Sequence, residues 1–492
     1  MAKDEVETMH LEDGDLQKDV AEGVISGEER LSPEEDKRIL RKVDILLPVM
    51  AMSYLFQFLD KSALGYTAIM GIREDLGLTG QDYSWSSSIY YFGYLIASYP
   101  AGVIMVRWRV GKLIAASVLI WGAILMLTPL CFNSTGLLTN RFFLGVAEAA
   151  IAPGLSIVVA MWYKRSEQPL RHGAWYLGNT CAGFFGGVSA YGIGHIQTIA
   201  SWKAVYLIFG ALTVAWSFAI FFLLPDVPGK ARFLSKSDRA KAVQRVEENM
   251  TGIKSSKFKW HQCIEAILDI KTWLLLLIQV SSNIGNGGVL TFGSIVVQGL
   301  GFSMFNTLLV QMISIAFQLV FVVTASAGST FFRNTRTYWM ACNLAFSIIG
   351  SAMIREIPDT HKWARFMGFC LTLGYTGNLP VLLSVASANF GGFTKKTTVN
   401  SLIFIAYCAG NIVGPQLFFA KEAPSYTSGF LAITVCFAIG FVACFVLRFY
   451  LIWENKRRDR VGGVLEAEES NHTTLNMMDK TDKEIPQFRY MY

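Results

Sequence analysis

The chain has 492 residues, of which 52% are hydrophobic and 16% are charged, and its mean hydropathy is +0.39. Soluble domains carry roughly 25% charged residues, so this composition indicates a membrane protein and argues against an ordinary soluble domain. The net charge of +6 does not indicate nucleic-acid binding, because basic loops at the inner membrane face explain the excess of Lys and Arg.

The N-terminal segment is acidic and poor in apolar side chains, so we expect residues 1–43 to be a disordered cytosolic tail and not a signal peptide. Twelve hydrophobic stretches follow, each near the ~20 residues that a helix needs to cross the hydrocarbon core. Stretches of this length satisfy their backbone hydrogen bonds as helices, so we predict an all-α membrane protein. The predicted spans are 45–70, 84–106, 112–131, 137–161, 174–194, 203–224, 272–296, 305–328, 338–354, 364–386, 398–419 and 428–452.

Short loops rich in Lys and Arg follow the second, fourth, eighth and tenth spans. Because such loops stay on the cytosolic side, we predict that both termini are cytosolic. The basic loop residues are Arg107, Arg109, Lys112, Lys164, Arg165, Arg171, Arg333, Arg336, Lys395 and Lys396.

One long polar insertion, residues 225–270, separates the sixth and seventh spans, and we expect it to be a cytosolic linker with an amphipathic helix. It divides the chain into six-helix halves at 44–224 and 271–452, followed by a cytosolic tail at 453–492. Arg107 and Arg333 lie 226 positions apart, and Asp60 and Asn286 share that offset. These repeats predict two pseudo-symmetric halves with a substrate cavity between them near the midplane, as in secondary transporters.

Two charges, Asp60 and Lys61, interrupt the first predicted span. Neighbouring helical residues point about 100° apart, so the two side chains cannot share one partner. In one interpretation Asp60 pairs with a neighbouring helix and Lys61 reaches the headgroups. In the other, Lys61 is a cationic anchor in a water-filled cavity.

The fourth predicted span carries Arg141 and Glu148, seven residues apart. That spacing places them on one helical stripe, about 10 Å apart along the axis. Burial in an apolar run favours the uncharged acid, so we predict that Glu148 binds and releases a proton near neutral pH. The alternative is a structural glutamate that is permanently protonated or hydrogen-bonded.

Uncharged polar residues inside other spans are candidates for orienting a substrate. We select Tyr91, Asn286 and Asn378, although interhelical hydrogen bonding is the alternative role for residues of this kind. The eight cysteines occur singly, without a CxxC motif or metal-like spacing, so we predict no metal and no cofactor. The sequence has no HExxH or GxSxG motif, which argues against a membrane enzyme.

Several segments carry a family resemblance, among them "LDKSALGYT", "RFFLGVAEAAIAPGLSIVVAMWYKRSEQPLR" and "NFGGFTKKTTVNSLIFIAYCAGNIVGPQLF". Over roughly residues 40–452 the chain resembles the anion:cation symporter family of the major facilitator superfamily, specifically its fungal allantoate permease branch. Val106 stands where the superfamily usually has an acidic residue. The resemblance implies that Lys61 and Arg141 bind an anion and that Glu148 couples its movement to protons.

The sequence therefore predicts a monomeric, proton-coupled importer of a small organic anion in a fungal membrane, which works by alternating access. The family resemblance implies that this anion is allantoate or another ureido acid, a small peptide, a vitamin carboxylate or an amino acid. Predicted substrate-binding residues are Lys61, Arg141, Asn286, Asn378 and Tyr91, and predicted proton-coupling residues are Glu148 and Asp60. An exporter of a small metabolite and a transporter-like nutrient sensor are the alternatives. We expect the plasma membrane as the location, with the endoplasmic reticulum as the other option.

Overall fold

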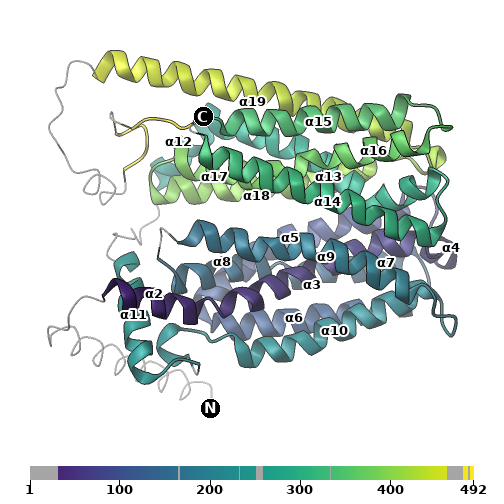
Figure 1. The fold of residues 1–492 in the computed structure, drawn as a ribbon, viewed down its shortest axis with the longest axis horizontal. Helices are drawn as coiled ribbons and strands as arrows, with labels where there is room; N and C mark the ends of the chain where they lie inside the picture. Colours follow the sequence, from purple (N-terminus) through teal and green to yellow (C-terminus); the bar gives the residue numbers. More distant parts are fainter. Residues whose placement is uncertain are drawn as a thin grey trace.

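A computed structural model describes residues 32–164, 167–231, 233–250, 259–332, 334–462, 480–485 and 488–492. Within these ranges all regular structure is helical, which confirms the predicted all-α class. Two bundles of helices lie side by side with their long axes parallel (Figure 1). Many large apolar side chains at the surface, such as Phe222 and Phe449, are more than half exposed, as expected for a surface that faces lipid.

The N-terminal bundle contains the helices that precede the predicted linker. They are α2 (Pro33–Val43), α3 (Leu46–Ala68), α4 (Ile72–Asp75), α5 (Asp82–Arg107), α6 (Val110–Leu127), η1 (Thr128–Leu130), α7 (Ser134–Glu148), α8 (Ile151–Trp162), α9 (Gln168–Ile193) and α10 (Ser201–Leu223).

The linker and the C-terminal bundle complete the chain. Their helices are η2 (Pro228–Lys230), α11 (Lys236–Met250), α12 (Trp260–Leu268), α13 (Ile270–Gly299), α14 (Met304–Phe331), α15 (Arg336–Glu356), α16 (Lys362–Thr372), η3 (Leu373–Gly377), α17 (Asn378–Asn389), α18 (Phe393–Gln416), η4 (Ala420–Glu422) and α19 (Thr427–Gly462). The predicted amphipathic linker helix corresponds to α11.

Nine helical segments of the described chain are long and apolar enough to cross a membrane. The remaining predicted spans, the first, second and fifth, correspond to α3, α5 and α9. Charged or hydroxyl-bearing residues lower the mean hydropathy of α3 and α5: α3 contains Asp60 and Lys61, and α5 begins with a serine-rich turn. In Figure 1 all three helices run through the N-terminal bundle beside the apolar ones. The count of twelve spans stays a prediction for these three.

The two bundles use the same order of helix partners. In the N-terminal bundle α3 packs on α9, α5 on α7 and α6 on α10. In the C-terminal bundle α13 packs on α18, α14 on the α16–η3–α17 segment and α15 on α19. Counted by predicted span, the first helix of each bundle packs on its fifth, the second on its fourth and the third on its sixth. Each bundle also has its own hydrophobic core.

Each bundle also contains one broken span beside a predicted site residue. The fourth span ends its first helix at Glu148 and resumes at Ile151, and the tenth span passes through η3 immediately before Asn378. Next to the first break, Gly145 lets two helices touch, because a Cβ atom there would lie 2.0 Å from the carbonyl oxygen of Tyr90. The backbone of α5 therefore rests directly on α7.

The bundles contact each other toward one end of the molecule. We call the end that carries α2, α11 and α12 the α2 end, and the opposite end the α4 end (Figure 1). Toward the α4 end, the hydroxyl of Ser88 donates to the carbonyl of Ile412 at 2.7 Å, and His195 stacks on Phe305 at 4.2 Å between ring centres. Helix pairs α5–α18, α9–α14 and α3–α13 form this contact.

Residues 33–43 differ from the expected disordered tail, because they form helix α2. Ser32 and Glu35 make a capping box at its start, and Asp36 of α2 pairs with Arg245 of α11 at 2.8 Å. The acidic segment is ordered because a basic linker helix supplies its ion-pair partners. Residues 1–31 of the predicted tail, together with Arg165 and Arg333, lie outside the described residues.

Candidate functional site

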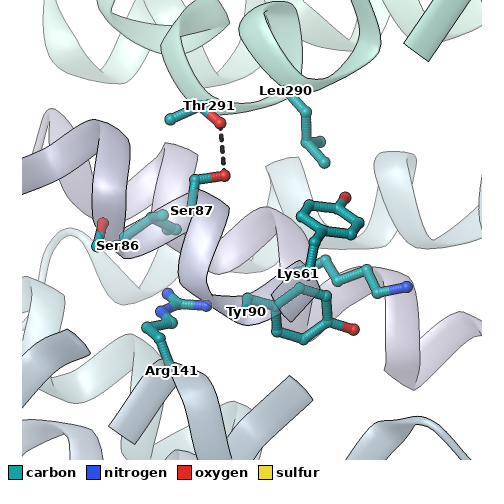
Figure 2. Close-up of a pocket in the computed structure, with 9 residues that line it drawn as sticks. Lys61, Ser86, Ser87, Tyr90, Arg141, Leu290 and Thr291 are labelled. Carbon is teal, nitrogen blue, oxygen red and sulfur yellow. Dashed lines mark hydrogen bonds between the residues drawn. The ribbon is translucent and has the colours of Figure 1, made fainter. Parts of the chain in front are cut away.

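A small cavity lies between the two bundles, and the atom-free space in and around it, open solvent included, is about 330 Å³. Three predicted site residues, Lys61, Tyr91 and Arg141, line it together. Its remaining lining residues are Leu64, Ser86, Ser87 and Tyr90 from the N-terminal bundle and Leu290 and Thr291 from the C-terminal bundle. Figure 2 shows Lys61 and Arg141 approaching from the N-terminal side, with Leu290 and Thr291 opposite.

Contacts between Tyr83, Ser87 and Thr291 join the bundles at the edge of this cavity. The hydroxyl of Thr291 donates to that of Ser87 at 2.8 Å, which is the dashed line in Figure 2. The hydroxyl of Tyr83 donates to the carbonyl oxygen of Thr291, also at 2.8 Å. These bonds lie on the α4 side and connect α5 to α13.

Lys61 lies on α3 between two aromatic faces. Its Nζ atom is 5.5 Å from the ring centre of Tyr90 and 5.2 Å from that of Tyr94, within the range of cation–π attraction. In the part of the chain that the structure describes, no carboxylate lies within ion-pair distance of Nζ. The lysine charge therefore lies between aromatic rings, and Glu148 acts on it electrostatically from beyond ion-pair distance.

Arg141 lies on α7 with 2% of its surface exposed. Its Nη2 atom donates to the hydroxyl of Tyr206 on α10 at 2.5 Å, and that hydroxyl is 3.2 Å from Oγ1 of Thr67. Nε of Arg141 has no hydrogen-bond acceptor among the described residues. The guanidinium is therefore oriented by a neutral hydroxyl, and Glu148 acts on its charge only from beyond ion-pair distance.

Glu148, at the end of α7, is fully buried. The hydroxyl of Tyr90 donates to its Oε2 atom at 2.6 Å, while Oε1 has no partner in the described chain. An ionised carboxylate with a bare buried oxygen is unfavourable, whereas a protonated one is tolerated. The geometry therefore suits a carboxyl group that exchanges a proton.

Asp60 lies on a different face of α3 from Lys61, as their adjacent positions predict. Its Oδ2 atom accepts hydrogen bonds from Nε1 of Trp121 at 2.6 Å and from the hydroxyl of Thr213 at 3.1 Å. Oδ1 has no partner among the described residues. The structure thus places Asp60 inside the N-terminal bundle, against α6 and α10, and not on the cavity lining.

Asn286 of α13 belongs to a chain of amides within the C-terminal bundle. Its Nδ2 atom donates to Oδ1 of Asn411 at 2.7 Å, and its Oδ1 atom accepts from the hydroxyl of Tyr375 at 3.2 Å. Asn411 in turn donates to Oδ1 of Asn283 at 3.1 Å. This chain joins α13, α18 and η3, one helical turn from the cavity residue Leu290.

Asn378 is 1% exposed and packs against α15. Its Oδ1 atom accepts from Nδ2 of Asn343 at 3.2 Å, and its own Nδ2 atom has no acceptor in the described chain. It does not line the cavity, because the η3 break turns the start of α17 toward α14 and α15.

Sequence reasoning missed the partners of the charged residues. Tyr206 and Thr213 lie in the sixth predicted span and Trp121 in the third, both of which are apolar and carry a charge only at their first residue, a lysine. A tyrosine or tryptophan at a buried position needs a hydrogen-bond partner, and that need is the only signal in the sequence. No group of three or more His, Cys, Asp or Glu suitable for a metal occurs within the described ranges.

Two helical bundles of matching internal order, with a polar cavity between them, define a secondary transporter. The chain belongs to the Major Facilitator Superfamily, whose family model matches residues 50–415. It is therefore a multi-pass membrane transport protein and not an enzyme.

Fungal transporters resemble the chain over most of its length. An uncharacterized transporter of Schizosaccharomyces pombe is 37% identical over 469 residues, which cover 93% of this chain and 86% of that protein. The allantoate permease of Saccharomyces cerevisiae is 35% identical over 475 residues, covering 94% and 87%. A thiamine pathway transporter of the same yeast is 30% identical over 487 residues, covering 95% and 90%. These similarities confirm the predicted resemblance to the allantoate permease branch.

Solved structures share the fold at low sequence identity. A bacterial homologue of the human lysosomal transporter Spinster, in an inward-facing and unoccupied conformation, has a TM-score of 0.61 at 15% identity and covers 83% of this chain and 97% of its own. The D-xylose–proton symporter has a TM-score of 0.61 at 13% identity, covering 82% and 96%. At these identities the likeness supports the fold alone.

Proposed function

We propose that the protein imports a small organic anion together with protons by alternating access. The observation that carries this proposal is that Lys61 and Arg141 line one cavity, and that neither forms a direct ion pair with a carboxylate in the described part of the chain. Two buried or half-buried cations repel each other and lose hydration, so an entering anion would gain from both. A carboxylate fits this role because it accepts hydrogen bonds from both Nζ and the guanidinium.

Glu148 is the proposed coupling group. Protonation would satisfy its bare Oε1 oxygen and remove a negative charge close to the cations, which favours entry of the anion. Release of the proton to the other side of the membrane would restore the negative charge and expel the anion. Asp60 is the second carboxyl group proposed for coupling, since its Oδ1 oxygen also lacks a partner among the described residues.

Neutral groups would complete substrate recognition. Tyr91 lines the cavity directly, and Asn286 and Asn378 are proposed to respond to the substrate through the C-terminal bundle. Asn286 is linked to the cavity through α13, and Asn378 stands at the η3 break. Glycines beside Asn286 pack tightly, since a Cβ atom at Gly287 would lie 2.9 Å from the carbonyl oxygen of Asn411. The substrate-linked movement of α13 is therefore transmitted to α18.

The conformation and the location are part of the proposal. The bundles touch toward the α4 end, and the predicted orientation puts the α2 end and both termini in the cytosol. The structure would then represent an inward-facing state of a plasma-membrane monomer. The relative named allantoate permease supports a ureido acid such as allantoate as the first candidate substrate.

Uptake by reconstituted protein tests this function. The protein in liposomes should accumulate labelled allantoate or another small carboxylate when the outside is acidic, and should not when the gradient is collapsed. Lys61→Ala should abolish uptake, whereas Lys421→Ala, at an exposed lysine of η4, should not. Accumulation that is independent of the proton gradient would contradict the coupling, and wild-type uptake by Lys61→Ala would contradict the anion site.

A further inference from the structure

The end of the chain returns to the C-terminal bundle at the α2 end. Residues 480–485 and 488–492 lie beside α12, α17 and α19 (Figure 1). Thr481 and Asp482 are fully buried, and Tyr490 is 4% exposed. These two described stretches, residues 480–485 and 488–492, are called the C-terminal segment below.

Both carboxylate oxygens of Asp482 are saturated with donors. Oδ2 accepts from Nζ of Lys271 at 2.6 Å and from the hydroxyl of Tyr490 at 2.7 Å. Oδ1 accepts from Nζ of Lys395 at 2.6 Å and from the backbone N–H of Gly391 at 3.1 Å. Two ammonium groups, one hydroxyl and one amide thus form a built site for a single carboxylate.

The donors come from elements that are distant in sequence. Lys271 lies in the first turn of α13, Gly391 in the turn between α17 and α18, and Lys395 in the first turn of α18. Lys395 also contacts Asp269 at 3.0 Å and Glu265 of α12 at 2.8 Å. Asp482 therefore ties the α17–α18 turn to the start of α13.

Backbone contacts fix the register of the C-terminal segment. The side chain of Asn389, at the end of α17, donates to the carbonyl of Met491 and accepts from its N–H, both at 2.7 Å. Asn455 of α19 makes the same paired contact with the backbone of Tyr490, both bonds at 2.9 Å. Arg458 of α19 donates to the carbonyl of Asp482 at 2.9 Å.

The two lysines keep Asp482 ionised in its buried position. Burial opposes its ionisation, but the ammonium groups of Lys271 and Lys395 outweigh that effect and hold the pKa of Asp482 well below its usual range. Without Asp482, the nearest carboxylate oxygen to Lys271 would be that of Asp269, at 3.5 Å. The buried lysine would lose its short ion pair.

We propose that the C-terminal segment is an intramolecular latch, in which the Asp482 carboxylate, docked between Lys271 and Lys395, holds the α17–α18 turn against the start of α13. The latch acts at the α2 end, opposite the contact between the bundles. In alternating access one bundle rocks against the other, so each end of a bundle moves relative to the partner bundle. A docked latch therefore makes the C-terminal bundle move as one rigid body, and an undocked latch lets the α17–α18 turn move separately.

Hydrogen exchange of the full-length protein tests the latch without any knowledge of the substrate. Asp482→Asn should raise amide exchange in residues 389–396 by roughly tenfold or more, because an ionic hydrogen bond that is lost contributes about 1.5 kcal/mol or more. Lys483→Ala, at the exposed neighbouring position, is the matched control and should leave exchange unchanged. Equal exchange in Asp482→Asn and Lys483→Ala would overturn the latch.

A variant truncated after residue 479 distinguishes release of the latch from misfolding of the protein. Its residues 389–396 should exchange faster while residues 140–148, in the N-terminal bundle, exchange as in the intact protein. A synthetic peptide of residues 480–492 should restore the protection, and the same peptide with Asp482→Asn should not. Failure of the intact peptide to protect, or equal protection by both peptides, would overturn the proposal and leave the proposed transport function unaffected.

Discussion

The hydroxyl of Tyr90 donates a hydrogen bond of 2.6 Å to Glu148, and the face of the same ring lies 5.5 Å from Nζ of Lys61. One side chain therefore contacts both the proposed proton-coupling carboxyl and the proposed anion anchor. A change in the charge of Glu148 is felt at Lys61, because the two groups interact electrostatically and share the Tyr90 ring. We therefore propose that Tyr90 couples protonation of Glu148 to binding of the anion at Lys61.

Tyr90→Phe tests that route because it removes the hydroxyl and keeps the ring beside Lys61. We expect the accumulation of substrate driven by a proton gradient to fall about tenfold, as loss of a hydrogen bond to a carboxyl group is worth roughly 1.5 kcal/mol. Binding measured without a gradient should change less. Tyr99→Phe, at a tyrosine of the same helix that is 81% exposed, is the control. Equal accumulation by both variants would remove Tyr90 from the coupling route.

Tyr206→Phe tests how Arg141 is oriented. The variant loses the acceptor for Nη2, so the guanidinium is left without its neutral partner and is free to rotate away from the cavity. We expect KM for the transported anion to rise about tenfold, which corresponds to ~1.4 kcal/mol, with little change in the maximal rate. Tyr191→Phe, near the α4 end, should keep the wild-type KM. A Tyr206→Phe protein with the wild-type KM would show that Arg141 needs no orientation by α10.

Substitutions of Asp60 separate its packing from its chemistry. Asp60→Ala leaves the indole N–H of Trp121 and the hydroxyl of Thr213 without an acceptor, at a cost of about 1–3 kcal/mol in the free energy of unfolding. Asp60→Asn keeps an oxygen acceptor but cannot ionise, so it should unfold near the wild-type temperature and lose proton-driven accumulation. Thermal unfolding and uptake measure the two effects, and full accumulation by Asp60→Asn would restrict Asp60 to a structural role.

Gly145→Ala tests the close contact that positions Glu148. The added methyl would lie 2.0 Å from the carbonyl oxygen of Tyr90, so α5 and α7 must separate, with a loss of stability of about 1–3 kcal/mol. Gly102→Ala, in α5, meets no atom within 4 Å and is the control. We expect a lower unfolding temperature and lower uptake for Gly145→Ala alone. If both variants unfold at the same temperature, the two helices have room to adjust.

The latch should be insensitive to pH in the physiological range. The pKa of Asp482 is lowered in the folded protein, so its contribution to stability is present above the unfolded value of about 3.9 and is lost as pH falls through the folded pKa. Glu265, Asp269 and Tyr490 face the same lysines. The difference in unfolding temperature between wild type and Asp482→Asn should stay constant from pH 8 to pH 5. A difference that disappears by pH 5 would contradict the assignment.

The sequence predicts the membrane class and the family because apolar spans and basic loops are local patterns. It also selects Lys61 and Arg141, since a charge inside an apolar run is visible without a structure, and the fold brings both to one cavity. Pairings between distant spans are not visible in this way. Tyr206 meets Arg141 only because α10 packs on α6, which in turn packs on α7. Asp482 meets Lys271 only because the chain returns 211 positions later.

The helix break after Glu148 and the ordered α2 segment both escaped prediction, for different reasons. The break has a local signal, because Pro153 has no N–H to donate to the carbonyl of Ala149. The α2 segment has no such signal, since it resembles a solvated acidic tail until its ion pairs with α11 are known.

Ligand-induced stabilisation of the purified protein tests the anion site most directly. A panel of small carboxylates, including allantoate, and their uncharged amide analogues is added to wild type, Lys61→Ala, Arg141→Ala and the control Lys421→Ala. A ligand at 100 times its Kd contributes about 2.7 kcal/mol to stability. We predict that at least one carboxylate raises the unfolding temperature of wild type and Lys421→Ala, while its amide analogue has no effect and neither cavity variant responds. Stabilisation by neutral analogues, or by carboxylates in both Lys61→Ala and Arg141→Ala, would contradict the account.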